Sequence, residues 1–409
     1  MAKIVPFRAI RPSRDKVSLV ASRSYLSYSK EILDEKLENN PFTFLHIINP
    51  DYSAGYKVNS YDKKFKLVKE KFKSFIKEGI FKKDNSDSFY IYQKNNVEGN
   101  SFIGIIGAAS VLDYQNSKIK IHEQTIKKRE ELFKNYLQTT GFNAEPVLLT
   151  YPDHKCINEV IQRYTQTRAE YEFTTTQKSQ HKLWLVNDKK DIRLIEQSFS
   201  EIENLYIADG HHRFASSSLL AKESKNINNS NTKFCMSYLI AEDQLQIISF
   251  NRLLKNINDL SDEDFLTQIK KKFLLKEVQK ALVPTQKDEI SLYISKKWYS
   301  LIAIEEYVNR KHCVEKLDPA ILSNNILAPI LGITDARNDK RLSFIDGTHS
   351  LKEIQQKVDS GEFKAAFLLK PISINQIKEV ADQGESMPPK STYIKPKLRS
   401  GMLIYDFED

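Results

Sequence analysis

Residues 209–213 form the densest set of chemically active side chains in this chain, in the order Asp-Gly-His-His-Arg. An apolar stretch typical of a buried strand precedes them, and a helical pattern follows. Gly210 permits a tight turn and a close ligand approach, and the amide groups at the start of the next helix favour an anion. Arg213 offers a planar fork for phosphate oxygens, and His211 and His212 offer further donors. The five residues therefore predict a phosphate-binding turn.

Two other interpretations of this turn stay open. Asp-Gly is a common turn sequence, and paired histidines also cap helices or face solvent. Histidines ligate zinc, but neighbouring helical residues point in different directions, and no cysteine or carboxylate follows at ligand spacing. A bound anion explains better why cationic side chains stand at a helix N-terminus, because the helix dipole opposes them there.

The elements that must position this turn predict a mixed α+β fold in several domains. Helices are expected at residues 29–38, 61–78, 125–137 and 261–272. Strands are expected at residues 42–48, 89–92, 102–111, 146–151, 181–186, 205–208, 238–241, 290–294 and 301–304. Gly141 fits the C-terminal end of the third helix. Gly104 and Gly107 lie inside a strand pattern and indicate a close backbone approach.

Changes in pattern along the chain predict three regions. Residues 1–115 form an N-terminal α+β lobe, residues 116–252 form the core that carries the turn, and residues 253–409 form a C-terminal α/β lobe. Within the last region, residues 384–401 are interrupted by proline and cannot form a regular helix. A polar loop is expected at residues 226–232, and no internal repeat is visible.

Composition indicates a soluble, cytoplasmic protein. The 409 residues are 40% hydrophobic, enough for large cores, and no apolar run is long enough to span a bilayer. Cys156, Cys235 and Cys313 are odd in number and far apart, which argues against a disulfide framework. The net charge of +9 is spread among interspersed lysines and acids, so nucleic acid is not an expected partner. The sequence does not indicate an oligomeric state.

Several motifs together resemble the ParB/sulfiredoxin-like superfamily. In its free-serine kinases, a His-Glu pair precedes a helix, a glycine, a Pro-containing strand and then Asp-Gly-His-His-Arg. The same order runs here from His122 and Glu123 through Gly141 and residues 145–148 to residues 209–213. The resemblance implies a ParB/sulfiredoxin-like phosphate-binding core, with a longer insertion before the turn than in compact members.

Over its full length the chain is similar to the bacterial domain-of-unknown-function family "ten-fifteen". The matching stretches are residues 40–41, 44–46, 122–125, 145–147, 206–213, 387–392 and 396–399. Sulfiredoxins carry cysteine where this chain has His211, so their sulfur chemistry lacks its nucleophile here. ParB-type proteins carry a helix-turn-helix after the core, and none is apparent after Arg213.

The resemblance implies a phosphotransferase acting on free L-serine or O-phospho-L-serine. The expected phosphoryl donor is ATP, ADP or pyrophosphate, with Mg²⁺ bridging its phosphates. Glu123 is the expected general base for the serine hydroxyl. Asp209 is the expected second catalytic residue and the expected carboxylate partner of Mg²⁺.

Further residues are expected to contact the substrate. These residues are His122, Thr125, Lys390, Ser391 and Thr392. The last three equally fit a purely structural role in a proline-rich tail. Asn251 and Arg252 either line the same cleft or make surface ion pairs. Two other functions stay open: a phosphoserine phosphatase, and a non-enzymatic nucleotide-binding switch or DNA-associated protein.

Overall fold

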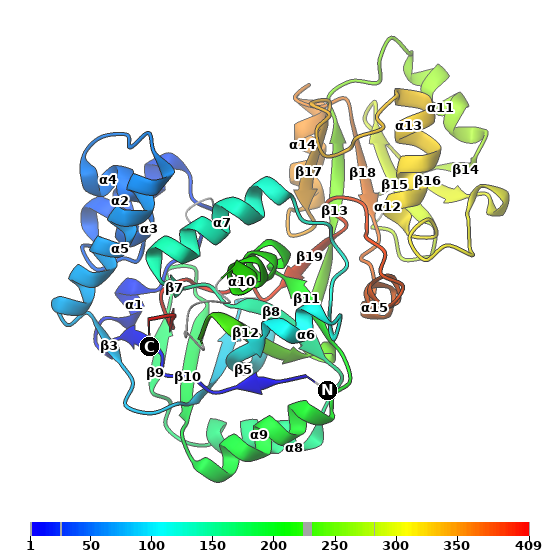
Figure 1. Ribbon diagram of the computed structural model, residues 1–409. Coiled ribbons are helices and arrows are strands. Elements are labelled where there is room, and N and C mark those ends of the chain that lie inside the picture. Colours follow the sequence, from blue (N-terminus) through cyan, green and yellow to red (C-terminus); the bar gives the residue numbers. More distant parts are fainter. Residues whose placement is uncertain (1, 25–26, 224–230, 282, 409) are drawn as a thin grey trace. The chain divides into compact units, whose positions relative to one another are not determined.

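The computed structural model describes residues 2–24, 27–223, 231–281 and 283–408, which form two compact units (Figure 1). The first unit consists of Met1–Lys120, Thr125–Leu245 and Pro396–Asp409, and the second of Ile121–Gln124 and Gln246–Lys395. Most of the polar loop expected at residues 226–232 lies outside the described residues.

A mixed nine-stranded sheet forms the centre of the first unit. Its strand order is β6-β11-β8-β12-β5-β4-β10-β9, and β1 pairs with β5. The strands are β1 (Ile4–Val5), β4 (Phe89–Asn95), β5 (Ser101–Ser110), β6 (Ile119–Lys120), β8 (Val147–Tyr151), β9 (Tyr171–Thr174), β10 (Gln180–Val186), β11 (Leu205–Asp209) and β12 (Phe234–Ala241). β11 runs antiparallel to β8 and parallel to β6, while β8 runs parallel to β12.

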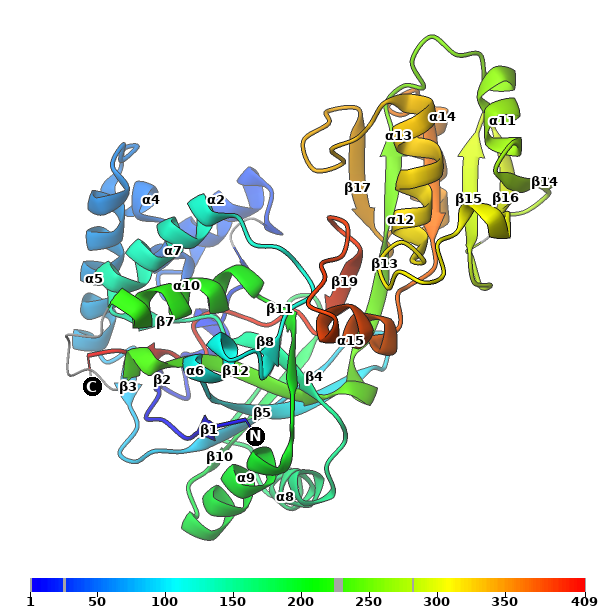
Figure 2. The same ribbon diagram turned by 45° about the vertical axis from the view of Figure 1, so that its right-hand side comes forward.

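Helices cover both faces of this sheet. Figures 1 and 2 show α7 (Lys127–Thr140) beside α10 (His211–Glu223) on one face, and α8 (Lys155–Thr165) beside α9 (Lys189–Glu201) on the other. Gly141 ends α7 with a φ of +80°, as its position after the helical pattern predicts. Asp188 begins α9 by accepting hydrogen bonds from the amides of Lys190 and Asp191. The sheet and its helices thus make three layers.

A helical cluster in the first unit packs through aromatic side chains. Its helices are α2 (Lys30–Asn39), α3 (Leu45–Ile48), α4 (Pro50–Ala54) and α5 (Tyr61–Lys77). The short elements of the unit are α1 (Val17–Val20), β2 (Ile10–Pro12), β3 (Phe81–Lys83), α6 (Val111–Gln115), β7 (Phe142–Asn143), η3 (Asn231–Lys233), η4 (Glu242–Gln244) and β20 (Tyr405–Asp406). Phe72 of α5 contacts Phe81 and Phe142, and all three rings are buried. α5 thereby buries the apolar side that the sequence pattern predicts.

The strand predicted at residues 42–48 is wrong, because this stretch contains the helix α3. The Thr43 hydroxyl accepts a hydrogen bond from the Leu45 amide, which starts the helical turn. Leu45 and Ile47 are both buried, which a strand with alternating faces would also allow. A short apolar run does not distinguish a strand from a buried helical turn by periodicity alone.

The second unit is built on a seven-stranded sheet in the order β14-β16-β15-β18-β13-β17, with β19 paired to β13. The strands are β13 (Gln246–Leu254), β14 (Phe273–Val278), β15 (Glu289–Ile294), β16 (Lys297–Ala303), β17 (Leu342–Asp346), β18 (Ala365–Leu369) and β19 (Thr392–Lys395). The helices are α11 (Asp262–Lys270), η5 (Glu305–Tyr307), α12 (Asp318–Leu322), η6 (Ser323–Leu327), α13 (Ala328–Leu331), α14 (Leu351–Asp359) and α15 (Ile374–Asp382). α11, α12 and α13 pack on one face of this sheet and α14 on the other (Figure 1).

The predicted fold class, mixed α+β, is confirmed by these two sheets and their helices. The structure divides the chain differently from the predicted boundaries at 1–115, 116–252 and 253–409. β4 and β5 come from the first predicted region, yet they pair with β10 and β12 of the second. The last residues, Pro396–Asp409, return to the first unit. Pairing between strands distant in sequence therefore merges two of the predicted regions. Across the described ranges, every helix is too short or too polar to cross a bilayer.

Gly104 should be essential for the central sheet. A methyl group at this position would overlap the carbonyl oxygen of Leu239 on β12, which is backbone and cannot rotate away. We expect Gly104→Ala to lower the free energy of unfolding by about 3 kcal/mol or more. Gly79→Ala is the control, because Gly79 has a φ of +73° but open space around it, and should cost about 1 kcal/mol. If urea unfolding showed the same loss of stability in Gly104→Ala and Gly79→Ala, this steric explanation would be contradicted.

Candidate functional site

The predicted phosphate-binding residues lie on a strand-turn-helix junction. β11 ends at Asp209, Gly210 has a φ of +100°, and α10 begins at His211. The pairing of β11 with β8 shifts register between Ile207 and Asp209, a local irregularity of the kind often found beside functional sites. A methyl group on Gly210 would lie 2.9 Å from Nε and Nη2 of Arg213. The backbone angle therefore favours glycine, and a larger residue would also have to displace the Arg213 guanidinium that lies over the turn.

Asp209 is held between two cations. One carboxylate oxygen accepts from Lys397 Nζ at 2.7 Å and the other from Arg213 Nη2 at 2.9 Å. Arg213 also donates from Nη1 to Glu145 at 3.1 Å. The second oxygen of Glu145 accepts from the Ser400 hydroxyl at 2.5 Å. The junction is thus closed by a network of two cations, two carboxylates and a hydroxyl.

Burial and charge act in opposite directions at this junction. Burial opposes ionisation of Asp209, but Lys397 and Arg213 outweigh it and hold the pKa of Asp209 below its ordinary value. Burial lowers the pKa of His211 to about 4, against the opposing pull of Asp209. Asp209 is therefore ionised and His211 neutral at pH 7. The His211 ring is buried, which differs from the exposed donor expected for a phosphate-binding side chain.

His212 connects the start of α10 to the start of α7. Its Nε2 accepts a hydrogen bond from the Ile126 amide at 3.1 Å, and Ile126 is the residue that precedes α7. The neighbouring Thr125 donates its hydroxyl to Glu130. Two of the predicted site residues thus organise the entry into α7, where a side-chain cap is otherwise lacking.

The remaining predicted residues belong to the second unit. His122 is buried, and its carbonyl accepts from the Met387 amide at 2.9 Å, while Glu123 follows it in the same unit. Lys390 is exposed with a φ of +55°, and the Ser391 hydroxyl donates to the carbonyl of Pro388 at 2.6 Å. Thr392 begins β19 opposite Ser249 of β13. Residues 209–213 therefore belong to one unit and these five residues to the other.

Sequence reasoning missed three residues that complete the junction. Glu145 contacts Arg213 and accepts from Ser400, and Lys397 contacts Asp209. Glu145 and Lys397 lie inside stretches that match the family pattern, and this match could have marked them as candidate site residues. Their charges had no assigned partner, because the partners lie far away in sequence: Asp209 and Lys397 are 188 positions apart.

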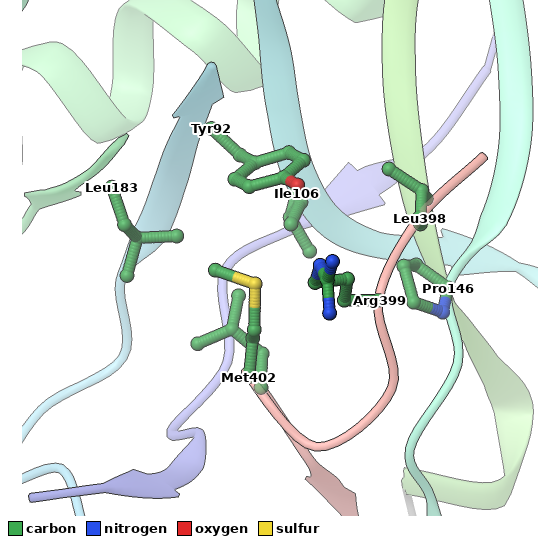
Figure 3. Close-up of a pocket in the computed structure, with 8 residues that line it drawn as sticks. Tyr92, Ile106, Pro146, Leu183, Leu398, Arg399 and Met402 are labelled. Atoms are coloured by element: carbon green, nitrogen blue, oxygen red, sulfur yellow. The ribbon is translucent and has the colours of Figure 1, made fainter. Parts of the chain in front are cut away.

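A small pocket of the first unit is not a substrate site. Figure 3 shows Arg399 reaching from the tail toward Tyr92 and Ile106. The cavity has a volume of about 10 Å³, which holds one water molecule at most, whereas small-molecule sites occupy hundreds of Å³. Arg399 donates to His181 Nε2 at 3.3 Å and to the carbonyl of Ala21 at 3.1 Å. It serves the packing of the tail.

The cysteines and potential metal ligands limit the chemistry of the described residues. Burial raises the pKa of Cys235 to about 11, so its thiol stays protonated near neutral pH. All three cysteines are free. In the described ranges, no three side chains among His, Cys, Asp and Glu gather as a metal site. A thiolate nucleophile at Cys235 is therefore not supported.

Comparisons with known proteins identify a family and several solved structures. A family model described as "Protein of unknown function (DUF1015)" matches residues 4–320, more than half of the chain. No curated protein matches the sequence. Among solved structures, a free serine kinase in complex with AMP is 14% identical, with 71% of this chain and 88% of that chain covered and a TM-score of 0.36.

Two further solved structures have similar values. SbnI with a C-terminal truncation, from Staphylococcus aureus, is 14% identical over 74% of this chain and 88% of that chain, with a TM-score of 0.39. A conserved hypothetical protein from Pyrococcus furiosus is 15% identical, with 71% of this chain and 93% of that chain covered and a TM-score of 0.35.

The buried His211 should make stability depend on pH. Its folded pKa of about 4 lies below the unfolded value of about 6.5, so the unfolded chain binds more protons between these values. The contribution is complete above pH 6.5 and is lost as the pH falls toward 4. Between pH 7 and pH 5 we expect a loss of about 2 kcal/mol from this residue.

Urea unfolding of His211→Gln at pH 7 and pH 5 tests this expectation. The free energy of unfolding should differ less between pH 7 and pH 5 in this variant than in the unsubstituted protein. His349→Gln, at an exposed histidine, should show the same difference as the unsubstituted protein. The buried His181, whose pKa burial lowers to about 3, should maintain part of the slope in all three proteins. An unaltered slope in His211→Gln would show that this ring is not buried in its neutral form.

Proposed function

We propose that this chain, which belongs to the DUF1015 family, is a phosphotransferase that phosphorylates free L-serine from a nucleotide or pyrophosphate. The observation that carries the proposal is the junction at Gly210. There a strand ends in an ionised carboxylate, and a helix begins with its amide groups next to two cations. Such a junction suits the phosphoryl group of a donor. The choice of serine as acceptor rests on the motif resemblance of residues 122–123 and 209–213.

The chemistry assigns one role to each group. Glu123 accepts the proton of the serine hydroxyl, and the oxygen attacks the terminal phosphorus of the donor. The bond from that phosphorus to the bridging oxygen of the donor breaks, and the nucleotide or phosphate leaves. Arg213 and the first amides of α10 stabilise the charge on the transferred group.

Asp209 does not form a ready magnesium site. Both of its oxygens contact cations, Lys397 and Arg213, and a metal ion would have to displace one of them. Mg²⁺ retains most of its waters and binds chiefly through phosphate oxygens in phosphoryl-transfer sites. Mg²⁺ therefore belongs in the assay as a companion of the donor, and no step is assigned to it.

The test is an incubation of the purified protein with L-serine and Mg²⁺. ATP, ADP and pyrophosphate are supplied in separate reactions, and phosphoserine is measured by mass spectrometry. Phosphoserine formation from one donor supports a kinase. Release of inorganic phosphate from phosphoserine without a donor would support a phosphatase instead. Nucleotide binding or tight DNA binding without turnover of either substrate would support the non-enzymatic alternative.

Arg213 should contribute to phosphate binding more than to stability. In Arg213→Ala, Asp209 retains Lys397 and Glu145 retains Ser400, so the junction should stay folded. Loss of a charge-assisted hydrogen bond should weaken binding of a phosphate ligand by about 1.5–3 kcal/mol. Calorimetric titration with pyrophosphate and ADP measures this effect. Arg193→Ala, on the exposed side of α9, is the control, and equal affinities for the two variants would contradict the assignment.

Glu123→Gln should reduce turnover by roughly 10²–10⁴ and leave ligand binding nearly unaltered. The amide has the shape of the carboxylate but accepts no proton, and a general base acts mainly in the transition state. Phosphoserine formation and ligand-induced thermal stabilisation should be measured on the same sample. Glu263→Gln, at an exposed position of α11, is the matched control. Normal turnover in Glu123→Gln would transfer the role of base to Asp209.

A further inference from the structure

Arg252 is a buried cation in the second unit. It lies on β13, between Phe344 of β17 and Phe367 of β18, and only 3% of its surface is exposed. Its Nη1 donates to the carbonyl of Phe250, and its guanidinium lies 5.4 Å from the centre of the Phe344 ring. In the described part of the chain, this is the one hydrogen bond that a guanidinium with five N–H donors makes.

Lys390 brings a second cation to the same strand. Its Nζ lies 5.2 Å from the centre of the Phe250 ring, the residue whose carbonyl binds Arg252. Tyr393 contacts the same ring edge-on at 5.7 Å. Lys390 is exposed, whereas Arg252 is buried. Both cations therefore contact Phe250, Arg252 at its carbonyl and Lys390 at its ring.

Neither cation is neutralised by the protein. Within the described ranges, no carboxylate lies within 4 Å of the Arg252 guanidinium or of the Lys390 ammonium. Burial alone lowers the pKa of Arg252 to about 9, which reflects the absence of a compensating charge. Unpaired buried charges are strongly destabilising, and surface pairs of like charge repel. Arg310 of the same unit shows the contrast, since it contacts both Asp288 and Glu305.

We infer that Arg252 and Lys390 form an oxyanion site of the second unit, which binds a phosphate group carrying at least two negative charges. Two cations without acidic partners match a dianion, and the planar guanidinium fork fits two phosphate oxygens. Phe250 contacts both cations, Arg252 through its carbonyl and Lys390 through its ring. This inference goes beyond the proposed function and does not depend on it.

A purely structural role for Arg252 makes a different prediction. If Arg252 serves to pack between Phe344 and Phe367, its removal leaves a cavity or an unpaired carbonyl and destabilises the free protein. If Arg252 instead binds an anion, its charge is uncompensated in the ligand-free protein. Arg252→Met then replaces this charge by an apolar side chain of similar length. The ligand-free protein should then be equally or more stable.

The experiment measures pyrophosphate and inorganic phosphate binding to the full chain by calorimetry, together with thermal unfolding. Arg252→Met should unfold at the same or a higher temperature than the unsubstituted protein without ligand. Its affinity for pyrophosphate should be 10- to 150-fold weaker, as expected for a lost charge-assisted contact. Arg252→Lys retains the charge but not the planar fork. Its affinity for pyrophosphate should lie between those of Arg252→Met and the unsubstituted protein.

Lys390→Gln keeps the inference testable even where Arg252→Met fails to fold, because Lys390 is exposed. It should weaken pyrophosphate binding at least threefold, and Lys276→Gln, at an exposed lysine of β14, should have no effect. Normal pyrophosphate affinity in Lys390→Gln or in folded Arg252→Met overturns the oxyanion site. Absence of phosphoserine formation by the unsubstituted protein overturns the proposed function instead, whatever the binding results.

Discussion

The ionised carboxylate of Asp209 is the constraint on which the first unit depends. It stands at the end of β11, where burial opposes its charge, so it must be compensated by cations. Lys397 and Arg213 supply that compensation, and Arg213 in turn engages Glu145. These three residues come from different segments: Lys397 from the tail, Arg213 from the start of α10 and Glu145 from the stretch before β8. Asp209 therefore helps to join these segments, and the tail is held as well by the pairing of β20 with β7 and by the bridge between Ile404 and Ile10.

The same carboxylate accounts for the composition of the turn. Arg213 reaches Asp209 only by folding over the main chain of position 210, and a side chain there would collide with it. The positive φ thus favours glycine, and a larger residue would also disturb the ion pair. The buried, neutral His211 next to it lets the helix begin without adding a charge that would need its own partner. Turn geometry and electrostatics agree at each position.

Two pairs of cations, one in each unit, have different surroundings. In the first unit, Lys397 and Arg213 are engaged by carboxylates, which makes a rigid and preorganised junction. In the second, Arg252 and Lys390 meet at Phe250 with no carboxylate among the described residues near them. Cations paired with carboxylates hold main-chain donors in position, whereas cations without such partners can bind an anionic ligand directly. Both arrangements suit phosphate chemistry, and they are physically distinct.

The sequence by itself determined the strand-turn-helix at Gly210, the helix that ends at Gly141 and the close approach at Gly104, because these depend on local patterns. It failed at residues 42–48, where a short apolar run has no decisive period. Only the tertiary structure decided that Lys397 pairs with Asp209 and that the ring of His211 is buried. Burial and pairing between distant residues arise from packing the whole chain, and no local pattern encodes them.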